Sequence, residues 1–411
     1  MRPFTTTIPF ADALQLALSA TAPLSRTEHV ALPAADGRVV AHDVASPLDV
    51  PPFDRAAMDG YAVLSADVAE ASAAAPVRLT CVARVYTGEV SVGDLRSGEC
   101  IQIATGAPLP AGADAVVMVE DTTESSDQTS GDRRIEFRSG ARAGQNIGRR
   151  AADIHIGAMV VTRGQVLTPS RIGALAATGH RTVEVIATPT VAIVSTGNEV
   201  VQPGLPLAPG QIYDINRFTL ESVVRRHGGH PVALASPNDT IDDLKAILDA
   251  ASAHDLIVFS GGSSVGDRDL VRDVIADRGE MLFHGIAVKP GKPTALARIG
   301  ASLFLGMPGN PTSCLSNAYI LLIPILRKMA GLPPWNPRTV DVPLAREIRS
   351  ASDRHQFYTV RLVTIDGTPR AEPAFKGSGD ITSMANADGY IEIPAGTTVM
   401  GAGGMVTVTL F

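Results

Sequence analysis

The sequence predicts a multidomain protein of the α/β plus β class. At 411 residues the chain exceeds one typical core, so two to four domains are expected. Between residues 190 and 331, short apolar runs alternate with segments of helical periodicity, which predicts a mostly parallel α/β sheet domain. Residues 77–161 carry short alternating runs separated by turns, which is typical of a small barrel-like β-domain. Residues 339–411 alternate in the same way and predict a small C-terminal β-domain.

Composition and charge exclude several function classes. The formal net charge of −7 argues against a general nucleic-acid binder, which needs a basic face. The longest apolar run, residues 319–326, is far shorter than a bilayer span, and no signal-peptide core follows Met1, so we expect a cytoplasmic protein without membrane contact. Cys81, Cys100 and Cys314 are widely spaced and suit a reducing compartment, where we interpret them as buried or inert thiols.

Local signals place the elements in order along the chain. Residues 8–22 have helical apolar spacing, and a second helix begins with Thr168 as its N-cap and ends at Gly179. The polar tract 122–132 is interpreted as a hairpin tip. Strands at 191–194, near Val232 and at 256–259 alternate with helices that end near His227 and span 241–251. A last helix runs from Thr312 to Gly331 with a bend at Pro324, and a Pro-rich linker follows.

Three loops in the α/β region have the composition of an anion site. Gly261, Gly262, Ser263 and Ser264 follow one predicted strand, and Gly309 and Asn310 lie between another strand and a helix start. Glycine lets backbone N–H groups approach an anion closely, and helix N-termini favour negative charge. The third loop, residues 289–293, sets Lys289 and Lys292 around Gly291 between two prolines. Neither a phosphate-binding P-loop nor a GxGxxG dinucleotide signature is present, so another arrangement must bind the oxyanion or phosphate.

Carboxylates surround the same predicted site. Glu199, Asp214, Asp267 and Asp269 lie in or near loops at the expected carboxyl ends of the strands, where open α/β sheets bind ligands. Oxygen ligands beside an anion indicate Mg²⁺, and helix capping is the alternative for any one of these carboxylates. The loop 46–63 combines prolines and acidic residues around Arg55 and is interpreted either as part of a site or as a packed surface loop.

Taken together, the motifs resemble the molybdenum insertase family, the molybdopterin molybdenumtransferases, to which the E domain of gephyrin belongs. The matching segments lie along most of the chain: PPFDRAAMDGYA at 51–62, ATGAPLPAGADAVV at 104–117, STGNE at 195–199, GQIYDIN at 210–216, SGGSSVGDRD at 260–269, KPGKP at 289–293 and GMPGNPTSC at 306–314. Their order is more specific than any one of them.

The resemblance implies an architecture and a reaction. It implies an elongated homodimeric subunit with an N-terminal domain (1–45 and 145–185), a barrel-like domain (46–144), an α/β molybdopterin-binding domain (186–331) and a C-terminal β-domain (332–411). The reaction implied is that of adenylylated molybdopterin with molybdate and Mg²⁺, giving molybdenum cofactor and AMP. A molybdopterin adenylyltransferase and molybdoenzyme acceptors are the implied partners.

The family's functional positions carry over residue by residue. The catalytic set implied is Asp59, Thr105, Asp153, Glu199, Asp214 and Asp269, of which Glu199, Asp214 and Asp269 are the proposed metal ligands. The substrate set implied is Gly261, Gly262, Ser263, Ser264, Lys289, Lys292, Pro293, Gly309, Asn310, Ser313, Arg361 and Ser383.

The chain departs from the family pattern in two places, and two other functions compete. Ser263 adds a hydroxyl to the first loop, and before Asp153 the family's usual Arg is replaced by Gly148, so Arg149 or Arg150 is expected to compensate. An adenylyltransferase or nucleotide pyrophosphatase is one alternative, but such proteins are expected to be shorter, single-domain units. A non-catalytic scaffold is the other, and it would need an exposed apolar groove or extra partner-binding domains.

Overall fold

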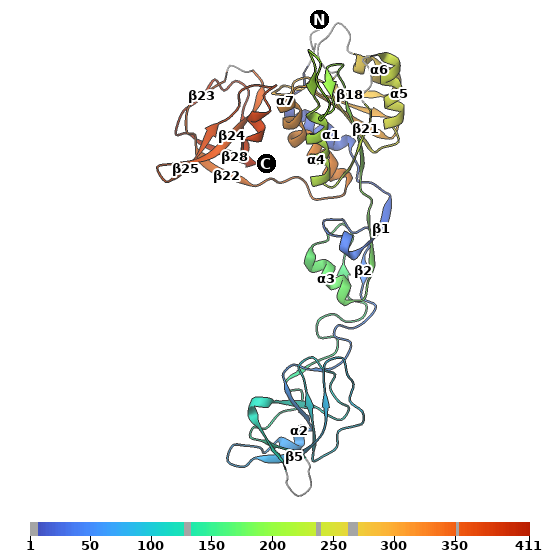
Figure 1. Ribbon diagram of the computed structural model, residues 1–411, viewed down its shortest axis with the longest axis vertical. Helices are drawn as coiled ribbons and strands as arrows, with labels where there is room; N and C mark the ends of the chain where they lie inside the picture. Colours follow the sequence, from blue (N-terminus) through green and yellow to red (C-terminus); the bar gives the residue numbers. More distant parts are fainter. Residues whose placement is uncertain (1–6, 127–132, 236–239, 262–269, 351–352) are drawn as a thin grey trace. The chain divides into compact units, whose positions relative to one another are not determined.

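The computed structural model describes residues 7–126, 133–235, 240–261, 270–350 and 353–411 (Figure 1). The chain divides into two compact units, which are described separately below. One unit comprises residues 1–29, 37–41 and 184–411, and the other comprises residues 30–36 and 42–183.

The first unit is built around a six-stranded sheet with the strand order β16-β13-β17-β21-β20-β18. These strands are β16 (His230–Ala233), β13 (Thr190–Ser195), β17 (Leu256–Ser260), β21 (Ser302–Met307), β20 (Ala295–Ile299) and β18 (Glu280–His284). The pairs β16–β13, β13–β17 and β17–β21 are parallel, whereas the pairs β21–β20 and β20–β18 are antiparallel. The sheet is therefore mixed, and the predicted parallel arrangement is found in its first four strands.

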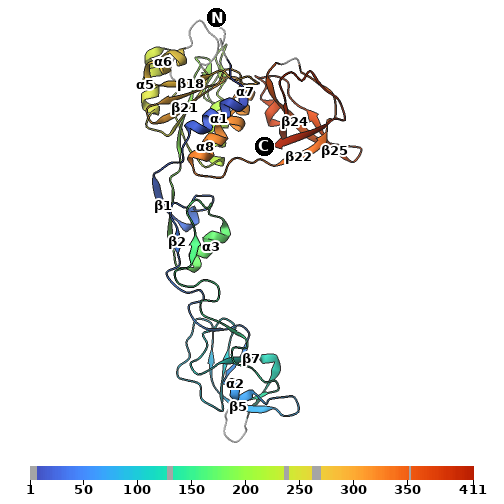
Figure 2. The ribbon, with the colours of Figure 1, turned by 180° about the vertical axis from the view of Figure 1, so that it is seen from behind.

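Helices cover both faces of this sheet, and alternate strand residues divide between them (Figure 1). One face packs against α1 (Phe10–Ala20), α4 (Asn216–Arg226) and the last long helical segment, and the other packs against α5 (Ile241–Ala251) and α6 (Leu270–Arg278). Ile193 and Val258 belong to the first core, and Val194 and Phe259 belong to the second. Because both faces are buried, the strands are nearly continuous apolar runs. Figure 2 shows α1 beside α8 on the first face.

The predicted bend at Pro324 takes the form of a change in helix type. The segment consists of α7 (Pro311–Asn317), a π-helical stretch (Ala318–Leu322) and α8 (Ile323–Met329). Pro324 has no N–H to continue the helical ladder, and the wider turn ends just before it. Gly331, at φ +68, follows the segment, and a side chain there would lie 2.5 Å from Ile186. The helix therefore ends at the predicted glycine because only glycine fits that turn.

The C-terminal part of the first unit is a β-domain, as predicted. Its main sheet has the order β19-β24-β26-β28-β22, with β25 paired to β24. The strands are β19 (Val288–Lys289), β24 (His355–Ile365), β26 (Gly389–Ile393), β28 (Met405–Leu410), β22 (Thr339–Pro343) and β25 (Thr368–Pro373). The edge strand β19 comes from the loop that carries Lys289, so the α/β region contributes one strand to this sheet.

The second unit contains a six-stranded sheet with the order β7-β4-β6-β5-β9-β8 and with β7 and β8 at its two edges. The strands are β7 (Ala115–Met118), β4 (Gly60–Val63), β6 (Glu99–Ile103), β5 (Val77–Val85), β9 (Arg133–Phe137) and β8 (Thr122–Ser126). The strands β8 and β9 pair as a hairpin, but residues 122–126 of the tract interpreted as its tip form strand β8, and the rest of the tract lies outside the described residues. Helix α3 (Pro169–Ala177) begins as predicted, because the Thr168 hydroxyl accepts a hydrogen bond from the Arg171 N–H at 3.4 Å.

The remaining elements are short. They are β1 (Thr27–Ala31), β2 (Val44–Ala45), β3 (Arg55–Ala56), β10 (Ile147–Gly148), β11 (Met159–Val161), β12 (Thr182–Ile186), β14 (Val200–Val201), β15 (Ile212–Tyr213), β23 (Ile348–Arg349), β27 (Val399–Met400), α2 (Ser65–Val68), α9 (Thr382–Ala385) and the 3₁₀ turns η1 (Leu32–Ala34) and η2 (Val119–Asp121). No helix among the described residues is long and apolar enough to cross a membrane.

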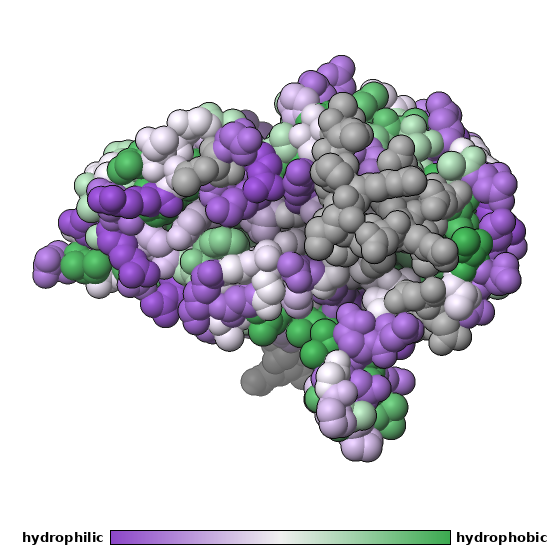
Figure 3. Space-filling view, turned by 90° about the horizontal axis from the view of Figure 1, so that it is seen from above, coloured by the Kyte–Doolittle hydropathy of each residue, from purple (hydrophilic) through white to green (hydrophobic). Residues whose placement is uncertain are grey.

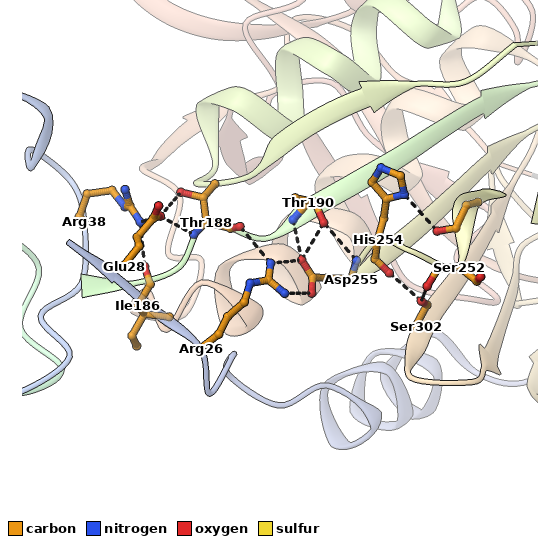
Figure 4. Close-up of polar contacts among 11 residues, drawn as sticks. Arg26, Glu28, Arg38, Ile186, Thr188, Thr190, Ser252, His254, Asp255 and Ser302 are labelled. Carbon is orange, nitrogen blue, oxygen red and sulfur yellow. Dashed lines mark hydrogen bonds and ion pairs between the residues drawn. The ribbon is translucent and has the colours of Figure 1, made fainter. Parts of the chain in front are cut away.

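The amino ends of β13 and β17 are fixed by a polar network (Figure 4). Asp255 accepts two hydrogen bonds of 2.6 Å from Arg26 and further bonds from the N–H and hydroxyl of Thr190. Burial alone would raise the pKa of Asp255, but these bonds outweigh it and lower that pKa. The network lies at the strand ends opposite to the predicted site, so its role is to hold the sheet in place.

In the view of Figure 3, hydrophilic and hydrophobic side chains are interspersed among the coloured residues. No large continuous apolar area is visible among the coloured, described residues of that view.

His227 makes the first unit sensitive to mild acid. The residue is 5% exposed and packs edge-on against Trp335, with ring centroids 4.7 Å apart. Burial, with Arg327 and Arg226 nearby, lowers its pKa to about 4. The folded state therefore keeps the ring neutral, and the unfolded chain binds the extra proton below its ordinary pKa of about 6.5. We expect the free energy of unfolding to fall, by up to about 1.4 kcal/mol per pH unit, as the pH drops from 6.5 to 4.

Urea unfolding at several pH values in this window measures that slope. His227→Gln should lack this contribution, while the exposed His29→Gln should keep the slope of the unsubstituted protein. An identical slope in all three proteins would contradict the prediction.

Candidate functional site

Three parallel strands of the first unit end at the same level. Ser195, at the end of β13, is in register with Ser260 of β17, which is in register with Met307 of β21. The loops that follow these strands therefore start side by side at the carboxyl edge of the sheet, where ligands of open α/β sheets bind. This arrangement was predicted from the alternation of strands and helices.

The loop that begins at Gly261 and the loop that contains Gly309 touch through their backbones. Gly261 has φ +101, and a Cβ there would lie 2.6 Å from the Thr196 carbonyl oxygen. A Cβ on Gly309 would lie 3.4 Å from the Cα of Gly261. Glycine is required at Gly261 because any side chain would meet the neighbouring strand-end backbone. Gly262, Ser263 and Ser264, which continue this loop, lie outside the described residues, as do Asp267 and Asp269.

Asn216 connects the two loops, and sequence reasoning did not single it out. Its amide nitrogen donates to the Ser260 hydroxyl at 2.7 Å and to the Gly309 carbonyl at 2.7 Å. The Asn216 amide oxygen and the Thr196 hydroxyl are both buried and lack a hydrogen-bond partner within the described part of the chain. Buried polar atoms without partners are costly, and they occur where a ligand or bound water completes the set. Asn216 therefore belongs to the floor of the site.

Replacing Asn216 with aspartate tests this connection. Asn216→Asp removes the donor and sets a carboxylate oxygen against the Gly309 carbonyl, so we expect a loss of about 2–3 kcal/mol in the free energy of unfolding at pH 7. The loss should shrink at low pH, where a protonated Asp can donate again. Chemical unfolding at pH 7 and pH 4 measures both effects. Asn198→Asp, on the exposed loop beside it, is the matched control and should change stability little. Equal effects of the two substitutions would refute the assignment.

Asp214 and Glu199, two of the three proposed metal ligands, lie beside the strand ends. The Asp214 carboxylate accepts hydrogen bonds from the Ser195 hydroxyl at 3.2 Å and from the Arg217 N–H at 3.0 Å, so it also caps the start of α4. Glu199 is exposed, and its carboxylate lies over Gly197. In the register of the β14–β15 pair, the backbones of Glu199 and Asp214 are three residues apart along the strand direction, which is about 10 Å. Among the described residues, no group of three or more His, Cys, Asp or Glu side chains could hold a metal ion.

Residues 289–293, which carry Lys289 and Lys292 and are called the lysine loop below, are bound by Asn317. Sequence reasoning did not single out this residue. Asn317 of α7 is fully buried, and its amide nitrogen donates to the Gly291 carbonyl at 3.0 Å and to the Thr294 hydroxyl. Gly291 has φ +110, and a Cβ there would lie 2.3 Å from the Asn317 amide oxygen. Lys289 is exposed, while Lys292 and Pro293 are half-buried. The loop thus presents its cations while its centre is locked against α7.

The start of α7 is partly covered by the C-terminal β-domain. The Thr312 N–H donates to the Ser378 carbonyl at 3.1 Å, and the Thr312 hydroxyl donates to the Asp380 carbonyl at 2.6 Å. The Asn310 amide nitrogen donates to the Ser378 hydroxyl at 3.1 Å. Ser313, predicted to bind the oxyanion at this helix N-terminus, is 3% exposed. The Thr312 N–H, one of the N–H groups at this helix N-terminus that were expected to be available to the anion, is therefore already bonded to the protein backbone.

The structure places Arg361, which was expected to bind the oxyanion with the two lysines, away from Lys289 along β24. Lys289 is in register with Gln356, so Arg361 lies five residues further along β24, or about 16 Å away. Arg361 instead pairs with Glu372 on β25. Ser383 is fully buried, and its hydroxyl accepts the Lys376 N–H at 2.9 Å. These contacts are structural within the C-terminal domain.

In the second unit, Asp59 and Thr105, both assigned to the catalytic set by resemblance, contact each other. The Thr105 N–H donates to the Asp59 carboxylate at 2.7 Å, and this bond with the Thr105 backbone lowers the pKa of Asp59. Both residues are exposed. A Cβ on the adjacent Gly60 would lie 1.9 Å from the Val117 carbonyl oxygen, so glycine there lets β4 pair closely with β7. The two loops present a carboxylate and a hydroxyl at one place.

Asp153 makes no ion pair with the basic residues expected to support it, within the described part of the chain. It is exposed, and its carboxylate has no hydrogen bond or ion pair among the described residues. Arg149 pairs with Asp54 at 2.7 Å, and Arg150 pairs with Asp49 at 2.6 Å. Within this unit, the two arginines stabilise the loop at residues 49–54 and do not compensate near Asp153.

The chain is similar to known proteins over almost its whole length. Family models match nearly the whole chain: "MoeA N-terminal region (domain I and II)" over residues 8–179, "Probable molybdopterin binding domain" over 192–328 and "MoeA C-terminal region (domain IV)" over 341–411. A molybdopterin molybdenumtransferase of Nostoc is 34% identical over 93% of this chain and 88% of its own length. The chain belongs to the molybdopterin molybdenumtransferase family. The resemblance seen in the motifs is thereby confirmed.

Other members of the molybdopterin molybdenumtransferase family agree over the same length. Molybdopterin molybdenumtransferase 2 of Mycobacterium tuberculosis is 35% identical over 92% of this chain and 94% of its own length. A crystal structure of a MoeA protein of molybdopterin biosynthesis from Pyrococcus horikoshii is similar with a TM-score of 0.83 and 38% identity, covering 98% of this chain and 99% of that chain. The multidomain organisation is therefore that of the family.

Proposed function

We propose that the chain inserts molybdate into adenylylated molybdopterin in the presence of Mg²⁺, and releases AMP and molybdenum cofactor. The coarser part of this statement, a transferase of molybdenum cofactor biosynthesis, follows from membership of the family. The observation that carries the finer part is the meeting of two glycine-rich loops and buried unpartnered polar atoms at one sheet edge. Such a surface suits a ligand with several oxygen atoms.

The residues of the lysine loop supply the chemistry proposed for molybdate. Lys289 and Lys292 carry positive charge on a loop whose centre is fixed by Asn317. A preorganised cation attracts a dianion without reorganising at the moment of reaction, which is the usual source of electrostatic catalysis. In this proposal molybdate is the substrate, and the lysines orient it toward the dithiolene sulfurs of the pterin.

The proposed Mg²⁺ ion would take oxygen ligands from Asp214, Glu199 and Asp269. Carboxylates are the ligands that this ion prefers, so the donor chemistry fits. When bound, the ion would offset the charge that develops as the pyrophosphate is cleaved. Because the described carboxylates do not converge, we assign no geometry to the ion, and Asp214 has a separate role in capping α4.

The direct test is AMP release from adenylylated molybdopterin by the purified protein, with and without molybdate, tungstate and Mg²⁺. We expect release that depends on both oxyanion and Mg²⁺, and that is lost in Asp269→Ala and Lys292→Ala. Release that ignores the oxyanions and survives both substitutions would overturn the proposal and favour a pyrophosphatase-like activity.

Assembly and location complete the proposal. We propose that the chain acts as a homodimer in the cytoplasm, where it receives its substrate from a molybdopterin adenylyltransferase and passes its product to molybdoenzymes. Light scattering after size-exclusion chromatography measures the first point, and a mass equal to one chain of 42.8 kDa would contradict it.

A further inference from the structure

Two cysteines of the second unit lie on adjacent strands and face the same core. Cys81 of β5 and Cys100 of β6 are register partners in a parallel pair. Neighbouring strands lie about 4.8 Å apart, which is within the Cα separation that a disulfide allows. Cys100 belongs to the core of this sheet and Cys81 packs against the same cluster, so the two side chains are on one face. Both are free thiols in the structure.

The two thiols have very different surroundings. Cys81 is half-buried, and a guanidinium nitrogen of Arg133 on β9 lies 3.6 Å from its sulfur. Arg133 also binds Glu124 of β8 at 2.6 Å and Gln102 of β6 at 2.7 Å, so its position is fixed. Cys100, by contrast, is fully buried. Tyr61 of β4 and Glu124 are the other titratable groups near this pair.

These surroundings assign a role to each thiol. The contact with Cys100 comes first among the causes that lower the pKa of Cys81 to about 6, and the Arg133 charge acts in the same direction. The same contact, with burial, raises the pKa of Cys100. Of the two thiols, Cys81 is therefore the one that ionises first. Cys314 is different, since burial raises its pKa to about 12.

We propose that Cys81 and Cys100 form a dithiol modification site that reacts with small disulfides such as oxidised glutathione. The Cys81 thiolate attacks one sulfur of the disulfide, which breaks the S–S bond and releases one glutathione thiolate. The Cys100 sulfur then attacks the Cys81 sulfur of the mixed disulfide, and the Cys100 proton passes to the departing glutathione sulfur. The second glutathione leaves as a thiol, so the protein loses two hydrogens and two electrons while the disulfide is reduced.

This inference does not depend on the proposed function, and it changes the interpretation of the cysteines. Cys314 is the buried, inert thiol that the sequence indicated. Cys81 and Cys100 are close enough to react with each other, which their separation in the sequence concealed. The new bond would join β5 to β6, and β6 leads directly into the loop that carries Thr105.

The test treats the full-length protein with oxidised glutathione at pH 7 and follows it by intact mass and peptide mapping. We expect a loss of two hydrogens, a Cys81–Cys100 linked peptide and an unmodified Cys314. Cys100→Ser should stop at one glutathione bound to Cys81, and Cys81→Ser should leave Cys100 unreacted. Reduced Cys81 and Cys100 after treatment would overturn the proposal, as would a lasting mixed disulfide in the unsubstituted protein.

A second measurement tests the attacking thiolate with both cysteines in place. The rate at which iodoacetamide alkylates Cys81 in the unsubstituted protein should rise about ten-fold between pH 5 and pH 7 and then level off. Arg133→Gln should lower the rate at pH 6 because the nearby charge is lost. A rate that keeps rising about ten-fold per pH unit up to pH 8 would show an ordinary thiol and refute the assignment of Cys81.

Discussion

Gly291→Ala is expected to destabilise the protein by about 3 kcal/mol and to abolish its response to molybdate. The new Cβ would lie 2.3 Å from the Asn317 amide oxygen and 2.6 Å from its nitrogen, and the backbone at φ +110 strains any residue other than glycine. Relieving both conflicts would require the lysine loop to move away from α7. Urea unfolding and oxyanion-dependent AMP release measure the two effects.

Two further variants separate the steric cause from other causes. Removing the blocking amide in Gly291→Ala/Asn317→Ala should restore part of the lost stability, with a coupling of about 1–2 kcal/mol relative to the two single substitutions. Gly401→Ala is the control, since a Cβ there meets nothing within 4 Å. If Gly291→Ala is as stable as Gly401→Ala, the proposed lock between the loop and α7 does not exist.

Lys292→Gln is expected to lower the rate of molybdate-dependent AMP release by about 100-fold while leaving thermal stability nearly unchanged. Loss of one preorganised charge from a reacting oxyanion costs about 2.7 kcal/mol of transition-state stabilisation, which corresponds to this factor. Lys289→Gln, on the exposed end of the same loop, should have a smaller effect that fades at high salt.

The control for these lysines lies on another surface of the same unit. Lys245 of α5 pairs with Asp277 at 2.9 Å, away from the strand-end loops, so Lys245→Gln should leave the rate unchanged. Equal rates in Lys292→Gln and Lys245→Gln would remove the lysine loop from the proposed mechanism. Loss of AMP release even without molybdate would instead point to a role in binding the pterin substrate.

The parts of the fold that were predicted are those with local signals. The helix after Thr168 was predicted because the signals for its start, Thr168 and Pro169, and for its end, Gly179, lie within one short stretch of the sequence. The α/β sheet was predicted because both of its faces are buried, which makes its strands apolar runs. The three loops at the site carry glycines, lysines and prolines in patterns that local reasoning can recognise.

The parts that could not be predicted depend on register and on distant partners. Asn216 bonds to residues 44 and 93 positions away, and no periodicity in the sequence contains that information. Arg361 was placed with the lysine loop from resemblance, whereas the pairing of β19 with β24 sets it five residues further along the strand. The hydrogen bonds that cover the start of α7 come from a loop 68 positions away. Such contacts follow from tertiary structure alone.

The strand β19 limits how this protein can be shortened or recombined. Val288 and Lys289 are the edge of the C-terminal sheet, although the chain reaches that sheet's other strands only after residue 338. A truncation at the Pro-rich linker would therefore remove the hydrogen-bonding partner of the very segment that carries Lys289. We conclude that the last domain is no independent module. If this domain were exchanged between relatives, strand β19 would have to pair with a different β24, and the lysine loop would have to change with it. We therefore expect the lysine loop and the C-terminal domain to be inherited together.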